Sequence, residues 1–127
     1  MKKTVWVFLI TLFLLLAVGV VCGRVSLHAA ERMCSLTEEI QSACDEGDLD
    51  RAMAQCEKLL DAWEKWETPL QLWTVHEDTD EVAILMRKLR AAIAQKDTLH
   101  IAMLCEEMRM SIDHLYHRDA PHVKNIL

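Results

Sequence analysis

Three groups of side chains in this 127-residue sequence have chemistry suited to metal binding, acid–base catalysis or cross-linking. The first is His76 with Asp80, four residues apart and therefore on one face if the segment is helical. An imidazole beside a carboxylate can act as half of a metal site or as an acid–base pair. Because a metal site needs three or four ligands, we expect this pair instead to organise a turn between helices.

The second group is His114 with His117, one helical turn apart. This spacing suits a divalent transition metal, but no paired thiolates or set of glutamates accompany the two histidines. Protonated histidines near a helix C-terminus also stabilise the helix dipole, and we expect that role here. His76, Asp80, His114 and His117 are therefore the only candidate metal ligands, and we expect no cofactor.

The third group is the cysteines, which are odd in number and lack a Cys-x-x-Cys pair. Most lie on apolar stripes, where a thiol behaves as a small hydrophobe. In an oxidising compartment one disulfide could form, and Cys56 with Cys105 is the best candidate because the two occupy equivalent positions in a repeat described below. No nucleophile elbow, phosphate loop, complete zinc motif or kinase signature appears, so we do not expect an enzyme.

The N-terminal segment predicts the location of the chain. Val5 to Cys22 carry no charge, and as a helix they cover about 27 Å, close to the thickness of a bilayer core. Lys2 and Lys3 outweigh Arg24 on the other flank, which favours a cytoplasmic N-terminus. We expect residues 1–4 in the cytoplasm, a transmembrane signal anchor at 5–23 and an extracytoplasmic domain at 24–127.

Two alternatives for this segment remain open. One is a cleaved secretory signal, although the apolar core of such signals is usually about 7 to 15 residues long. The other is a lipid-modified Cys22, although Gly19-Val20-Val21 is a poor match to the residues that usually precede such a cysteine. We expect an uncleaved anchor in the cell membrane.

The charge of the domain excludes some partners. Without Lys2 and Lys3 the chain carries 12 basic and 20 acidic residues, a net charge of about −8. Binding to nucleic acid, or adhesion to an anionic membrane surface, depends on basic patches. We therefore expect no nucleic-acid partner, and an acidic surface that is simply solvated.

Apolar residues at intervals of three and four predict helices throughout the domain. A first helix ends near Glu46, where Gly47 supplies the stop and Asp48 the next N-cap. A second helix is expected to end at Thr68-Pro69, with proline opening the third. The resulting fold class is all-α.

The second half of the domain follows the same rules. A break is expected in the third helix between Trp73 and Asp80, Asp97 caps the fourth helix, and Pro121 ends it. The domain then contains one antiparallel hairpin at about 27–67, a second at about 69–118 and a tail at 119–127.

A weak internal repeat of 49 residues supports this organisation. The matched pairs are Ile40 with Leu89, Ala43 with Ala92, Asp48 with Asp97, Cys56 with Cys105, and Glu57 with Glu106. Each copy is a helix, a tight acidic turn and a helix. Two copies are too few for a tetratricopeptide-like array, so we expect two stacked hairpins, an arrangement that a simple four-helix bundle would share.

The chain also resembles a known family. The similarity covers the anchor, the Gly47-Asp48 turn, the Trp63-Glu64-Lys65-Trp66 segment, His76 with Asp80, the stripe from Leu85 to Ile93, and the closing Asn125-Ile126-Leu127. These features resemble the DUF4363 family, small single-pass bacterial membrane proteins of unknown function that are common in spore-forming Firmicutes. The resemblance implies an all-helical exterior domain and no known reaction. Val75 stands where the family pattern has aspartate before the histidine, which weakens an acid–histidine mechanism.

Two functions follow from these features. The first is a noncatalytic protein-interaction or scaffold component of the cell envelope or of sporulation, with a protein partner. Trp66 and Trp73 are its candidate binding residues, because exposed tryptophans are effective at interfaces, although both could simply close one end of the bundle. The alternative is a cation-binding or sensing module centred on His76 and Asp80.

Overall fold

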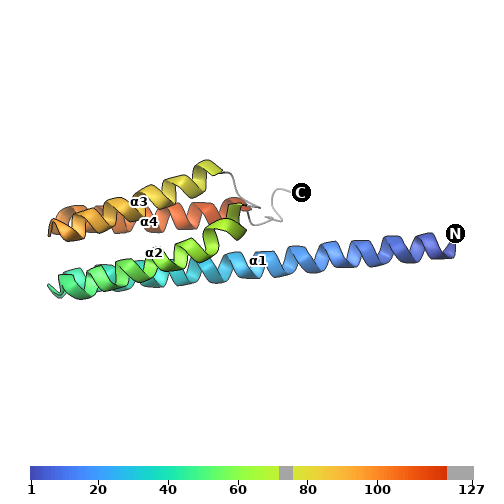
Figure 1. Ribbon diagram of the computed structural model, residues 1–127, viewed down its shortest axis with the longest axis horizontal. Coiled ribbons are helices and arrows are strands. Elements are labelled where there is room, and N and C mark those ends of the chain that lie inside the picture. The colour runs from blue at the N-terminus through green and yellow to red at the C-terminus, as the bar shows by residue number, and fades with distance from the viewer. Residues whose placement is uncertain (72–75, 120–127) are drawn as a thin grey trace.

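The computed structural model describes the backbone of residues 1–71 and 76–119 and the side chains of residues 1–68 and 79–115. Within these ranges the chain forms four helices and no strand (Figure 1). The helices are α1 (Lys2–Asp45), α2 (Leu49–Gln71), α3 (His76–Ala94) and α4 (Thr98–Asp119). The predicted all-α fold class is confirmed.

The helices form an antiparallel bundle in which each helix contacts two neighbours. The contacting pairs are α1 with α2, α3 with α4, α1 with α4, and α2 with α3. Among the described residues, neither diagonal pair contains Cα atoms within 8 Å of each other. The two predicted hairpins therefore stack side by side and close into an up-down-up-down bundle, as Figure 1 shows.

Helix α1 has two parts with different environments. Its N-terminal half extends alone beyond the bundle in Figure 1, and the apolar side chains of this half are exposed. Its C-terminal half packs into the bundle through a stripe that includes Met33, Leu36 and Ile40. Within the described residues, α1 is the one helix long and apolar enough to cross a membrane, and a signal sequence would meet the same criteria.

The two hairpin turns are built alike. In the first, Gly47 has a φ of 78°, its N–H donates to Cys44 O at 3.0 Å, and the N–H of Asp48 donates to Ala43 O at 2.8 Å. These two bonds define a Schellman motif, which satisfies the last carbonyls of α1. The predicted helix stop at Gly47 is confirmed.

The second turn repeats this geometry without a glycine. Lys96 has a φ of 57°, its N–H donates to Ile93 O at 3.1 Å, and the N–H of Asp97 donates to Ala92 O at 3.1 Å. Lys96 is thus a side-chain-bearing residue in the left-handed region that favours glycine.

Each turn also supplies an N-cap. Asp48 Oδ1 accepts a hydrogen bond from the N–H of Arg51 at 3.0 Å, and Asp97 Oδ1 accepts one from the N–H of His100 at 3.2 Å. Both bonds satisfy an N–H in the first turn of a helix, which has no carbonyl partner there. The predicted caps of the second and fourth helices are confirmed.

The predicted end of the second helix at Thr68-Pro69 is wrong, because α2 continues to Gln71. Proline lacks the N–H that donates to the carbonyl four residues earlier and its ring crowds that carbonyl, yet α2 continues for two residues beyond Pro69. In Figure 1 the last turns of α2 bend away from α1, as a proline near a helix end explains. The third helix begins at His76 rather than at Pro69, and Trp73 lies outside the described residues.

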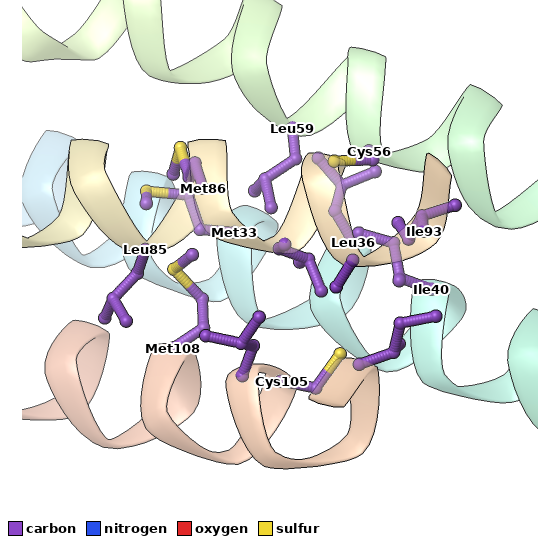
Figure 2. Close-up of a cluster of buried hydrophobic side chains, with 14 of the residues drawn as sticks. Met33, Leu36, Ile40, Cys56, Leu59, Leu85, Met86, Ile93, Cys105 and Met108 are labelled. Carbon is purple, nitrogen blue, oxygen red and sulfur yellow. The ribbon is translucent and has the colours of Figure 1, made fainter. Parts of the chain in front are cut away.

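The core has the same internal symmetry as the sequence. Residues 49 apart are buried together in pairs: Met33 with Val82, Leu36 with Leu85, Ile40 with Leu89, Ala43 with Ala92, Ala52 with Ile101, Cys56 with Cys105, Leu59 with Met108, and Trp63 with Ile112. Figure 2 shows many of these side chains meeting along the bundle axis. The pseudo-twofold axis therefore runs along the bundle and exchanges the two hairpins.

Candidate binding groove and exposed apolar face

A groove that carries charged side chains lies between α1 and α2. We call it the basic groove. It has a volume of about 380 Å³, and its lining residues are His28, Arg32, Leu36, Lys58, Asp61, Ala62, Lys65 and Trp66. Helices α1 and α2 pack against each other, and the ring of His28 on α1 lies beside the ring of Trp66 on α2. The groove is large enough for a small ligand or for the end of a larger one.

The charges in the basic groove are unbalanced. Arg32, Lys58 and Lys65 form no ion pair with any side chain that the structure describes, and Asp61 is the single carboxylate in the lining. Some cations elsewhere on the bundle are paired, such as Arg90, whose Nε lies 3.0 Å from Glu57 Oε1. The groove is thus locally positive on a chain whose net charge is −6.

Trp66 closes one end of the groove. Its side chain is half-buried, and its ring meets the ring of His28 edge to face, with centroids 6.4 Å apart and an interplanar angle of 89°. Such a T-shaped contact fixes the indole while leaving part of its surface open to a ligand. Trp66 was predicted from the sequence as a partner-binding candidate, and the structure places it at a groove.

A second surface feature lies on the outer face of α4. Leu99, Met103 and Met110 are 70%, 53% and 65% exposed and, at spacings of four and seven, lie on one side of the helix. This α4 apolar stripe faces away from the buried Ile101 and Met108. Apolar residues gathered on one exposed helix face are typical of a surface that binds another protein.

The candidate metal ligands remain predictions. Asp80 is exposed on α3 and His114 is exposed on α4, whereas the side chains of His76 and His117 lie outside the described residues. Among the side chains described, no three His, Cys, Asp or Glu residues are close enough together to hold a metal ion. The second tryptophan candidate, Trp73, also lies outside the described part of the chain.

All five cysteines are free thiols. The pseudo-twofold axis places Cys56 on α2 and Cys105 on α4, a diagonal pair of helices with no Cα atoms within 8 Å. A disulfide needs Cα atoms about 4.4 to 6.8 Å apart, so this arrangement does not allow the predicted candidate bridge. Equivalence in the repeat puts the two residues across the bundle axis instead of beside each other.

The buried thiols are poor nucleophiles. Burial raises the pKa of Cys56 to about 11, with a further increase from the Glu57 carboxylate and a partial decrease from Arg90. Burial also raises the pKa of Cys105 to about 12, and the nearby Cys44 thiol adds to this effect. Since the thiolate is the reactive form, these cysteines act as packing residues at neutral pH.

Sequence reasoning missed the basic groove and the α4 apolar stripe. The groove joins residues about 30 positions apart, so it appears only once α1 and α2 are paired in register. The stripe carried a usable signal, because Leu99, Met103 and Met110 are apolar yet fall off the core periodicity of α4.

A family model described as a domain of unknown function (DUF4363) matches residues 24–126. The match spans the whole four-helix bundle and begins just after the apolar segment of α1. Neither a protein of curated function nor a solved structure matches the chain.

Proposed function

The chain belongs to the DUF4363 family, whose description states no activity, and we propose that this member is a noncatalytic, membrane-anchored interaction protein of the bacterial cell envelope. The N-terminus lies in the cytoplasm and the bundle outside the membrane, where it holds a protein partner in envelope or sporulation assembly. The observation that carries this proposal is the α4 apolar stripe, which exposes Leu99, Met103 and Met110 on the outside of an otherwise well-packed bundle.

The continuity of α1 supports the anchoring part of the proposal. The helix runs without a break from Lys2 to Asp45, so the apolar segment and the bundle share one rigid element. An anchor of this kind holds the bundle at a fixed height above the bilayer, with both hairpin turns at its far end. A short basic flank at Lys2 and Lys3 supports the cytoplasmic position of the N-terminus.

The anchor is tested by the mass and the topology of the protein in cell membranes. We expect the membrane fraction to contain the full-length chain, and an external protease to remove the bundle from intact cells stripped of their wall. A chain shortened at its N-terminus and released from the membrane would contradict the anchor.

The partner is tested by site-specific photo-crosslinking of the full-length protein in living cells. We expect a photoreactive residue at Met103 or Met110 to give one reproducible adduct with an envelope protein. In the matched control the same photoreactive residue replaces Arg87, which is exposed on α3 outside the stripe. Equal yields of the same adducts from positions 103 and 87, or none from position 103, would overturn the proposal for the stripe.

A further inference from the structure

We propose that the basic groove binds the phosphate of an anionic phospholipid headgroup in the membrane that holds α1. This inference rests on the anchoring proposed above and concerns a different surface from the α4 apolar stripe. It assigns a ligand to a place on the bundle where cations without an ion pair among the described side chains, an indole ring and a cavity occur together.

The first argument is the charge of the groove. Arg32, Lys58 and Lys65 converge on one cavity without an ion pair among the described side chains, and all three are exposed. A phosphate can therefore pair with them without breaking an existing interaction. Phosphate oxygens accept charge-assisted hydrogen bonds from Arg and Lys, which are stronger than bonds between neutral groups.

The second argument is height above the membrane. His28 follows Cys22 by six residues, which places it about 9 Å beyond the apolar segment along α1. The interfacial layer of a bilayer is about 5 to 8 Å thick on each side. The Trp66 end of the groove therefore lies at the outer edge of the headgroups.

Basic residues continue from this end of the groove toward the bilayer. Arg24, His28 and Arg32 follow one another at intervals of four, along one side of α1. Arg24 lies within about 3 Å of the end of the apolar segment, at the level of the phosphates. A headgroup drawn out of the layer thus passes Arg24 before it reaches the cations of the groove.

The third argument is the composition of the groove wall. Leu36 and Ala62 provide an apolar floor, and Trp66 lies at the end nearest the membrane. Tryptophan is enriched at membrane interfaces because its ring suits a half-apolar, half-polar environment. The groove volume of about 380 Å³ accommodates a glycerophosphate headgroup with part of its backbone.

Overall acidity does not oppose this binding. Without Lys2 and Lys3 the chain carries a net charge of about −8 spread over the bundle, whereas a bound headgroup at short range responds to the cations in contact with it. The lipid is therefore held by the groove rather than by general adhesion of the bundle to the membrane.

The test is isothermal titration calorimetry of the full-length protein in nonionic detergent micelles. Short-chain phosphatidylglycerol, short-chain phosphatidylcholine and glycerol phosphate are titrated in separate experiments. The groove variant is Lys58→Gln with Lys65→Gln. The matched control is Arg87→Gln with Lys88→Gln, which removes the same charge from exposed positions on α3. Circular dichroism confirms that both variants remain helical.

We expect phosphatidylglycerol to bind at least about tenfold more tightly than phosphatidylcholine, and the groove variant to lose about tenfold to thirtyfold in affinity while the control variant loses little. Glycerol phosphate binding as tightly as the lipid, and lost in the groove variant, would confirm a phosphate site but overturn the lipid as its source. Equal affinities of the two variants, or no binding of any probe, would overturn the site itself. The anchor is judged separately, by the mass of the chain in membranes.

Discussion

Gly47 and Lys96 occupy the same position in the two hairpin turns, 49 residues apart, and both have a left-handed backbone, with φ of 78° and 57°. A residue with a Cβ in this region costs about 1 kcal/mol relative to glycine. Lys96→Gly should therefore raise the free energy of unfolding by about 1 kcal/mol. Urea unfolding of the full-length protein in micelles, followed by circular dichroism, measures the change.

The reciprocal change at the first turn is the control. Gly47→Ala should lower the free energy of unfolding by about 1 kcal/mol. A Cβ built at Gly47 meets no atom within 4 Å, so the loss would come from the backbone conformation and not from a clash. If Lys96→Gly lowers stability, the left-handed turn at Lys96 is not the state that the protein adopts in solution.

The N-caps give a second prediction. Asp48→Ala should lower the free energy of unfolding by about 1 kcal/mol, because the Arg51 N–H loses the carboxylate 3.0 Å away. Asp48→Asn keeps an acceptor oxygen in the same place and should cost much less. Equal losses in the two variants, measured by the same unfolding experiment, would mean that the charge of Asp48 and not its hydrogen bond stabilises α2.

Helix α3 offers a direct comparison between its buried and exposed faces. Leu89 is fully buried, and Leu89→Ala should lower the free energy of unfolding by about 2 to 5 kcal/mol through lost transfer energy and the cavity left behind. Ile84 is 49% exposed on the same helix, and Ile84→Ala should cost about 0.5 kcal/mol. Similar losses at both positions would show that Ile84 is covered in solution.

Most of the features tested by these variants were already indicated by the sequence. The periodic stripe through Ile40 and Leu89 predicted the core, and the acidic turns at Asp48 and Asp97 predicted both caps, because spacing and capping are local signals. The predicted helix end at Thr68-Pro69 was wrong, because local rules place proline at a helix start more readily than inside a last turn. The left-handed conformation of Lys96 was not predicted, because local rules assign this position to glycine or asparagine.

The residues of the candidate site were harder to predict than the core, because tertiary structure brings them together. Trp66 was found from its residue type, but Arg32 and Lys58 are separated by 26 positions and become neighbours only when α1 and α2 pair. The Cys56–Cys105 suggestion failed for a related reason. A repeat shows which residues are equivalent, but the symmetry axis decides whether equivalent residues meet.

The buried thiols predict how stability depends on pH. An exposed thiol ionises near pH 9.0, whereas burial raises the pKa of Cys56 to about 11 and that of Cys105 to about 12. Below about pH 8 both thiols are protonated in the folded and the unfolded chain, and they add no pH dependence. Between pH 9 and about 12 the unfolded chain releases protons that the folded chain retains, so the free energy of unfolding falls as the pH rises.

The variant that tests this linkage is Cys56→Ala with Cys105→Ala. Its stability at pH 8 should be lower than that of the native chain, because two buried side chains become smaller. Between pH 8 and pH 10.5 the free energy of unfolding of the variant should fall less than that of the native chain. The variant lacks two thiols that titrate differently in the folded and unfolded states. Urea unfolding at both pH values, with a reductant present, measures the two losses. Equal losses in the native chain and the variant would mean that these two thiols do not govern alkaline unfolding.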